Sequence, residues 1–128
     1  MIKKIFFTFL LLLLLSVNSY SAGSSDNSKT KTSYDKAVAY IKSAKKYEKK
    51  DKIKKANKSY EKALKLLIKS NKKKPNNPDT LNYLGFTTRK LGDYEGGEKF
   101  YLEGLAIEPN HIGINEYLGE LYVVTNRI

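Results

Sequence analysis

The chain has 128 residues, with 24 lysines and arginines against 13 aspartates and glutamates, and a formal net charge of +11 at pH 7. Its length is enough for one small domain. It contains no cysteine, which excludes disulfide bonds, a thiol nucleophile and a thiolate metal site. Apolar packing must therefore supply the stability of the fold.

The first residues are typical of a secretory signal peptide. Lys3 and Lys4 precede an apolar run over residues 5–17, and a short stretch of small and polar residues follows. We expect cleavage after Ser21, because Ser19 and Ser21 then occupy the two positions that must be small. An uncleaved membrane anchor is the alternative, although a membrane span needs about 18–20 apolar residues and this run is shorter.

The predicted signal peptide, residues 1–21, implies an exported protein. The expected location is the periplasm of a Gram-negative-type bacterium, and secretion or anchoring by the uncleaved signal are the alternatives. Residues 22–33 are polar and have nothing to bury, which predicts a disordered linker. Residues 34–128 are expected to form the folded domain.

Two groups of residues recur at a spacing of 34 positions. A proline followed by asparagine stands at Pro75 and again at Pro109, and prolines of this kind end helices. The tripeptide Tyr-Leu-Gly begins at Tyr83 and again at Tyr117. A period of 34 residues with leucine-glycine inside the first helix resembles the tetratricopeptide repeat family.

The middle unit, residues 78–111, fits this family well. Gly92 and Asp93 predict a turn between its two helices, because glycine ends one helix and aspartate caps the next. The last unit, residues 112–128, contains only a first helix.

Small residues inside the middle unit predict close packing between helices. Each glycine within a helix costs about 1 kcal/mol of helix propensity against alanine, which close packing must offset. The glycines concerned are Gly85, Gly97 and Gly104.

The first unit, residues 37–77, fits only with an overlong second helix. After a turn over residues 49–52, this helix must continue to Lys74, nearly two turns beyond the usual end. The core positions expected in the first helix are Tyr40, Ser43, Ala44 and Tyr47. The apolar stripe expected in the second helix consists of Ala56, Tyr60, Ala63, Leu64, Leu67 and Ile68.

The resemblance implies an all-α fold, in which antiparallel helix pairs stack into a right-handed superhelix of about two and a half repeats. It also implies a concave face that holds a peptide or a partner's helix. By position, the first unit contributes Ile41, Lys45 and Glu48 to this groove. The other units contribute Asn82, Tyr83, Phe86, Arg89, Lys90, Glu116, Tyr117 and Glu120. The alternative, an unrelated helical bundle, leaves the spacing of 34 residues unexplained.

The sequence offers no candidate for catalysis. The single histidine, His111, follows Pro109 in an expected turn, without a serine and aspartate or a metal-ligand spacing around it. Gly96 and Gly97 fall inside an expected helix and not in a phosphate-binding loop. We therefore expect a non-catalytic scaffold or adaptor that binds a protein or peptide partner, with no cofactor and no metal.

Lysine is concentrated between positions 29 and 74, with 18 lysines against four acids. Nucleic-acid binding is disfavoured, because this segment has no arginine for base readout and the predicted signal directs the chain out of the cytosol. Attraction to an anionic membrane or cell-wall surface is a second interpretation, and would make the chain a structural or assembly protein of the envelope. A biased composition is slightly favoured, because lysines such as Lys45, Lys46 and Lys49 surround their helix.

The last expected helix is apolar around most of its circumference. A terminal helix of a repeat array should instead have a polar outer face. The array therefore either continues beyond the sequence, which is favoured, or this face docks on a partner or on a second copy of the chain. The apolar residues concerned are Tyr117, Leu118, Leu121, Tyr122, Val123, Val124 and Ile128.

Overall fold

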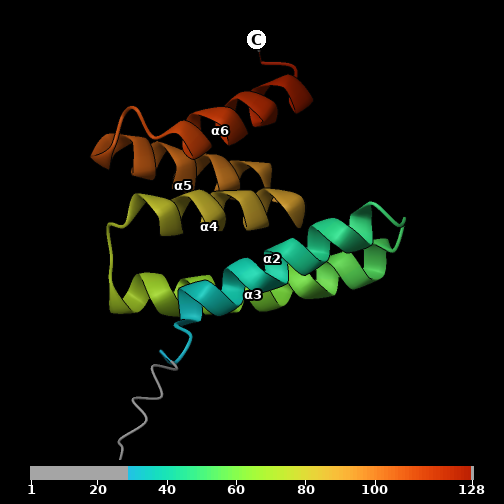
Figure 1. Ribbon diagram of the computed structural model, residues 1–128. Coiled ribbons are helices and arrows are strands. Elements are labelled where there is room, and N and C mark those ends of the chain that lie inside the picture. Colours follow the sequence, from blue (N-terminus) through green and yellow to red (C-terminus); the bar gives the residue numbers. More distant parts are fainter. Residues whose placement is uncertain (1–28, 128) are drawn as a thin grey trace, which may run out of the picture.

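The computed structural model describes residues 29–127, which form five α-helices joined by short turns (Figure 1). In chain order these are α2 (Ser33–Glu48), α3 (Ile53–Lys73), α4 (Pro78–Lys90), α5 (Tyr94–Ile107) and α6 (Ile112–Val124). Each helix packs against the next as an antiparallel neighbour. The described part of the chain is all-α, as expected. The predicted signal peptide and most of the predicted linker lie outside the described residues.

Helix α2 begins at Ser33, the last residue of the segment predicted to be a linker. Thr32 and Asp35 set this start through a capping box. The Thr32 hydroxyl accepts from the Asp35 N–H at 3.1 Å, and the Asp35 carboxylate accepts from the Thr32 N–H at 2.9 Å. Hydrogen bonds from the hydroxyl and backbone of Thr32 hold the pKa of Asp35 below its ordinary value.

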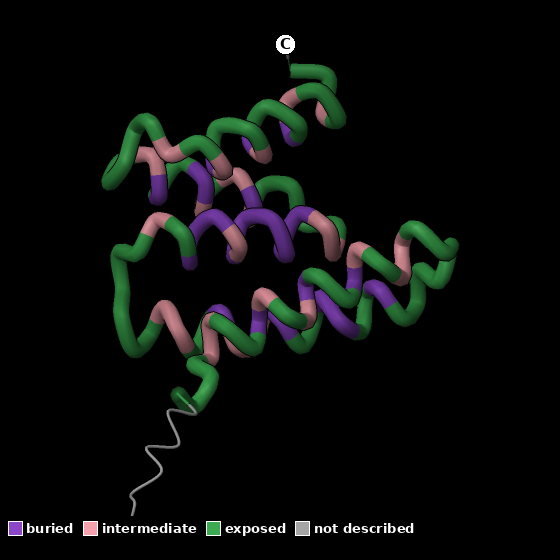
Figure 2. Tube along the Cα trace, in the orientation of Figure 1, coloured by how far each residue is buried: buried purple, intermediate pink, exposed green. Residues whose placement is uncertain are grey.

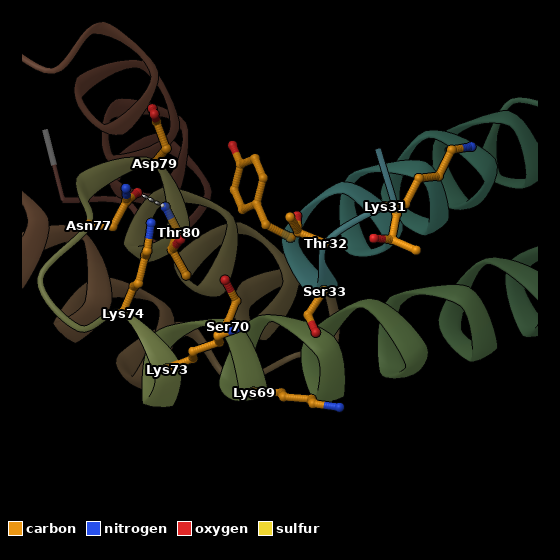
Figure 3. Close-up of a pocket in the computed structure, with 12 residues that line it drawn as sticks. Lys31, Thr32, Ser33, Lys69, Ser70, Lys73, Lys74, Asn77, Asp79 and Thr80 are labelled. Atoms are coloured by element: carbon orange, nitrogen blue, oxygen red, sulfur yellow. Dashed lines mark hydrogen bonds between the residues drawn. The ribbon is translucent and has the colours of Figure 1, made fainter. Parts of the chain in front are cut away.

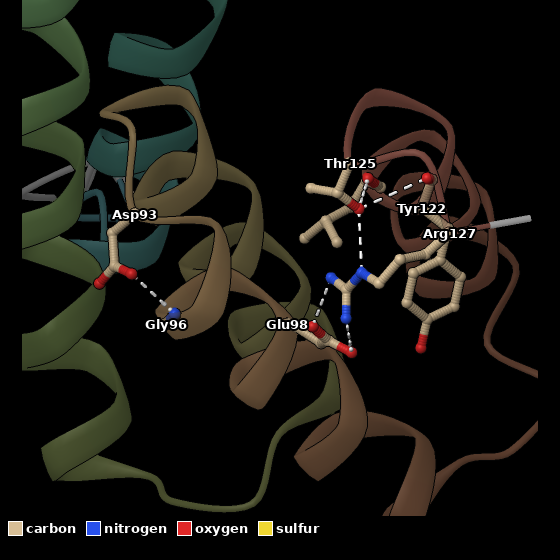
Figure 4. A network of polar contacts seen from close by, with 7 residues as sticks. Asp93, Gly96, Glu98, Tyr122, Thr125 and Arg127 are labelled. Atoms are coloured by element: carbon tan, nitrogen blue, oxygen red, sulfur yellow. Dashed lines mark hydrogen bonds and ion pairs between the residues drawn. The ribbon is translucent and has the colours of Figure 1, made fainter.

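The turns between helices fall where the sequence predicted them. Residues 49–52 separate α2 from α3, and Gly92 lies in the turn between α4 and α5. Gly92 has a φ of 100°, a conformation that glycine adopts with little strain. Asp93 then caps α5, because its side chain accepts from the Gly96 N–H at 2.8 Å (Figure 4).

Helix α3 has 21 residues against 14 in α5, so the prediction of an overlong second helix that ends near Lys74 is confirmed. Its buried residues are Ala56, Ser59, Tyr60, Ala63 and Leu67. Leu64 is half-buried, and Ile68 is 52% exposed, so the prediction that Ile68 belongs to the buried stripe is wrong. Leu67 takes the buried position, and the next residue points about 100° further around the helix.

The buried face of α2 consists of Ala37, Ile41 and Ala44. The prediction that Ser43 is a core residue is wrong, because Ser43 is exposed, and Ile41, which was expected in the groove, belongs to the core and is only 3% exposed. The Ser43 hydroxyl donates to the backbone oxygen of Ala39 at 3.1 Å. A register error of one residue turns a helix by about 100°, which exchanges a core position for a surface position.

Helices α4 and α5 approach closely at their glycines, as the sequence predicted. A Cβ atom on Gly97 would lie 2.9 Å from the backbone oxygen of Gly85 and 3.0 Å from the Cβ of Arg89. Gly85 in turn lies directly against the ring of Tyr101, which is fully buried. The backbones of the two helices can come this close only where no side chain intervenes.

Helix α4 lies in the interior of the arrangement, and Figure 2 shows buried residues over most of its length. One buried cluster joins α2, α3 and α4, and a second joins α5 and α6. Gly104 of α5 lies against Ile114 of α6 and Leu81 of α4, so the third predicted glycine also marks a close contact.

The turn after α6 is attached to α5 through Arg127. Its guanidinium makes two hydrogen bonds with the Glu98 carboxylate, at 2.7 and 3.2 Å, and its Nε donates to the Thr125 hydroxyl at 3.0 Å (Figure 4). The bidentate geometry gives this pair directional specificity. The hydrogen bond with Glu98 raises the pKa of Arg127.

Replacing Gly97 by alanine should destabilise the domain by about 1–3 kcal/mol, the usual cost of forcing an extra group into a packed interior. The added methyl group would meet the backbone of α4, which has no alternative rotamer. The matched control is Gly119→Ala on α6, where no atom lies within 4 Å of the added carbon. This control should stabilise the domain by up to about 1 kcal/mol. Urea unfolding followed by circular dichroism measures both, and equal effects would contradict the close-packing explanation.

Candidate functional site

The residues that the sequence placed in a groove come from α2, α4 and α6, and the structure brings Lys45, Arg89 and Tyr117 together around Phe86. The Phe86 ring centroid lies 4.7 Å from that of Tyr117 and 5.9 Å from that of Tyr60. Lys45 Nζ lies 4.6 Å from the Phe86 centroid and donates a hydrogen bond to the Tyr117 hydroxyl at 3.1 Å. An ammonium over an aromatic ring is attractive. We call Lys45, Tyr60, Phe86 and Tyr117 the Phe86 cluster.

Two ion pairs flank the Phe86 cluster at the C-terminal end of α4. Arg89 pairs with Glu120 of α6 at 2.8 Å, and Lys90 pairs with Glu48 of α2 at 2.6 Å. The Lys90–Glu48 pair is partly exposed and contributes about 1 kcal/mol or less. Together the two pairs connect α4 by charge to α6 and to α2.

Burial divides the predicted groove residues into two sets, which we call the floor and the rim. The floor consists of Asn82, Phe86 and Arg89, each more than nine-tenths buried. The rim consists of the half-buried Tyr83, Lys90 and Tyr117 and the exposed Glu116 and Glu120. Within residues 29–127, Asn82 Oδ1 and Arg89 Nε have no hydrogen-bond partner.

The contact that covers the Phe86 ring could not be predicted from the sequence. It depends on Lys45 and Tyr117, which are 72 positions apart in the chain and meet across α4. Tyr83 on the rim is also engaged within the domain, since its ring centroid lies 6.0 Å from that of Tyr34. Several of the predicted groove residues are therefore already in contact with other side chains of the domain.

Tyr60 and Tyr101 are fully buried, each with its ring against a neighbouring helix. Burial raises the pKa of both phenols, since a phenolate would lose its hydration. The Glu48 carboxylate raises the pKa of Tyr60 further, and the Arg89 guanidinium lowers that of Tyr101 in part. Both tyrosines remain protonated at neutral pH, and they act as packing groups.

A pocket of about 600 Å³ lies at the N-terminal end of α4, between the start of α2 and the last turns of α3 (Figure 3). Its charged lining consists of Lys31, Lys69, Lys73, Lys74 and one carboxylate, Asp79. Asn77 caps α4 at this pocket by accepting from the Thr80 N–H at 2.9 Å. Sequence reasoning missed the pocket, because its walls come from three separate segments and share no motif.

Tyr34 also lines this pocket. Burial, followed by the negative charge of Asp79, raises the pKa of Tyr34 to about 12. The pocket has four lysines against one acidic group, and it is therefore suited to an anion.

His111 caps α6. Its Nδ1 accepts from the Ile114 N–H at 3.1 Å, and its Nε2 lies 2.9 Å from Asp79 Oδ1. These contacts assign the hydrogen to Nε2, because Nδ1 must be free to accept. His111 therefore holds the start of α6 and also connects it to the first turn of α4.

Residues 29–127 contain no group of three or more histidine, cysteine, aspartate or glutamate side chains placed to hold a metal ion. No helix in this range combines the length and the apolar character needed to cross a bilayer.

The exposed side of α6 carries apolar residues, among them Ile112 at 83% exposed and Val123 at 62%. Leu102 and Ile107 of α5 are also exposed. Docking of a partner or a second copy on α6 stays a prediction.

Phe86→Ala should destabilise the domain by about 3–5 kcal/mol, because it removes a buried ring that contacts three helices. Leu102→Ala on α5 is the control, and should cost about 1 kcal/mol or less because this side chain is 49% exposed. Thermal and urea unfolding of both variants measure the difference. Similar losses would show that the Phe86 cluster does not organise the domain.

His111→Ala should destabilise the domain by about 1 kcal/mol through loss of the α6 cap, whereas His111→Asn should keep most of the stability. Asparagine retains an acceptor for the Ile114 N–H but not the contact with Asp79. The melting temperatures of the two variants test whether His111 acts as the N-cap of α6. This role is contradicted if both substitutions lower the melting temperature equally.

Comparison with known proteins finds no protein-family model that matches the chain and no curated protein that matches it. Residues 29–127 are established as an all-helical domain of five sequentially packed helices, with no family identified.

Proposed function

We propose that this chain is a tetratricopeptide-type repeat protein of the bacterial envelope that binds a protein or peptide partner and does not catalyse a reaction. The observation that carries the proposal is the convergence of α2, α4 and α6 around the Phe86 cluster. In a repeat of this type these three would be the first helices of successive units, and their shared side would be the concave binding face.

The bounds of α4 and α6 support the repeat. Both helices have 13 residues, and both their first and their last residues are 34 positions apart, at 78 and 112 and at 90 and 124. Gly85 and Gly119 are equivalent positions in this scheme. Gly85 lies against Tyr101 of the following helix, whereas Gly119 has no atom within 4 Å of its added carbon. A helix packed beside α6 would give Gly119 the environment of Gly85.

The rim of the face favours a peptide or a protein segment as the ligand. Tyr83 and Tyr117 offer partly exposed aromatic rings, while Lys90 and Glu116 offer both signs of charge. In the floor, Asn82 Oδ1 is buried without a donor among the described residues, and such a group costs free energy until it is satisfied. A backbone N–H from a bound chain would supply that donor if the chain reached the Asn82 side chain.

Export to the periplasm is part of the proposal and rests on residues 1–21 alone. The proposed absence of catalysis is supported by the contacts of three groups that could act as acids or bases. His111 is engaged in capping α6, and the buried Tyr60 and Tyr101 are held in their protonated forms. The exposed apolar residues on α6 would pack against a second copy of the chain or against a further helix.

The test compares two double variants of the full chain as bait in pull-downs from envelope extract. Tyr83→Ser with Glu116→Lys changes the rim, and Tyr94→Ser with Glu103→Lys makes the same chemical changes on exposed positions of α5. A partner of the groove should be recovered at about a tenth or less with the rim variant, which corresponds to about 1.4 kcal/mol of binding free energy, and undiminished with the α5 variant.

Circular dichroism of both variants establishes that they remain folded. The proposal fails if the rim and α5 variants retain or lose the partner equally. It also fails if the unaltered chain recovers no protein beyond those recovered by an unrelated bait.

A further inference from the structure

The lysines of α3 lie on one side of the helix. Eight of them fall between positions 54 and 73, and all eight are exposed. At about 100° per residue they occupy an arc of about 100°, on the side away from the buried Ala56, Ala63 and Leu67. We call these eight residues the α3 lysine stripe. The expectation that lysines surround their helices is therefore wrong for α3.

Biased composition does not explain the stripe. The exposed positions of α5 carry a single lysine, Lys99, among glutamates and apolar residues such as Glu95, Glu103 and Leu102. If lysine were simply the default surface residue of this chain, α5 would carry it as α3 does. The stripe belongs to one helix and one face.

The charges of the stripe are not neutralised within the domain. None of its lysines takes part in an ion pair among residues 29–127, where the four pairs present involve other residues. Glu61 is the single acidic residue of α3, and it lies at the edge of the arc. Eight lysines without ion pairs along about 29 Å of helix produce a positive local field, which attracts an anionic partner.

The stripe continues into the pocket at the start of α4. Lys69 and Lys73 belong to both, and Lys31 and Lys74 extend the positive surface around the end of α3 (Figure 3). Hydroxyl groups of Thr30 and Ser70 also line the pocket. Lysines and hydroxyl-bearing residues lining a space of about 600 Å³ suit a phosphate-bearing headgroup.

We propose that the α3 lysine stripe and this pocket dock the domain on an anionic phospholipid surface. Helix α3 packs only against α2 and α4 and lies at the edge of the arrangement (Figure 1), so a flat surface can meet its whole length. Screening by salt limits the attraction to charges within about 10 Å of the lipid, which a helix lying on the surface satisfies.

A nucleic acid fits the stripe less well. The stripe contains no arginine to read base edges, and the one tyrosine of α3, Tyr60, is buried and cannot stack on a base. The same chain also carries the apolar run of residues 5–17, whose predicted role in export brings the domain to a membrane. This inference does not depend on the partner-binding face, and either can fail alone.

The experiment measures binding of the full chain to vesicles of phosphatidylglycerol and phosphatidylcholine in equal parts, and to vesicles of phosphatidylcholine alone. The ratio of the two partition coefficients removes a contribution of the apolar N-terminal run that is equal for both lipids. Lys58→Gln with Lys65→Gln and Lys69→Gln should lower this ratio by about 100-fold, since each lysine near an anionic surface contributes about fivefold. Raising the salt concentration should abolish the preference.

The control removes the same charge elsewhere, through Lys36→Gln and Lys46→Gln on α2 and Lys99→Gln on α5, all exposed positions. It should lower the ratio by less than about tenfold. Equal losses in the two triple variants would overturn the proposal, because the attraction would then reflect net charge alone.

A second readout does not depend on mutation. Acetylation of lysines with and without vesicles, followed by mass spectrometry, should show protection of Lys58, Lys65 and Lys69 by anionic vesicles but not by neutral ones. Lys99 should be acetylated equally in both. Uniform protection overturns the assignment. Binding of a duplex oligonucleotide that matches the anionic vesicles in affinity and needs the same three lysines would identify a nucleic acid as the ligand instead.

Discussion

Phe86 joins parts of the domain that are far apart in the chain. Its ring contacts Tyr60 of α3 and Tyr117 of α6, and the Lys45 ammonium of α2 lies over it. Because α2 and α6 meet only across α4, this ring fixes how the first helix pair is placed against the rest. The close approach at Gly85 and Gly97 holds α4 against α5, so the helix that carries Phe86 is fixed in position.

The same packing decides the chemistry of the candidate groove. Asn82 and Arg89 are buried on the same helix as Phe86, and Asn82 Oδ1 and Arg89 Nε have no hydrogen-bond partners among the described residues. Buried polar groups of this kind cost stability. In the proposed binding mode, a partner that contacts Phe86 must displace Lys45 and Tyr117, which lie over this ring.

Charge divides the molecule into two surfaces of different character. The long outer face of α3 carries eight lysines with Glu61 at its edge, while the α4 and α6 side combines Arg89 and Lys90 with Glu116 and Glu120. A uniform field attracts any anionic surface over a distance of about 10 Å, whereas mixed charges recognise a partner only in contact. If α3 lies on lipid, α4 and α6 remain free, so one small domain could hold a partner close to a membrane.

The sequence by itself determined the helices and their ends. Local chemistry decides these features: Gly92 and Asp93 form a turn, glycines mark close approaches, and the length of α3 follows from apolar periodicity. Only the tertiary structure decided which face of α2 is buried, because Ile41 and Ser43 are equally compatible with a helix and differ only in what packs against them. The contact over Phe86 and the lysine-lined pocket likewise come from segments that are distant in the chain. No local sequence pattern predicts that these segments come together.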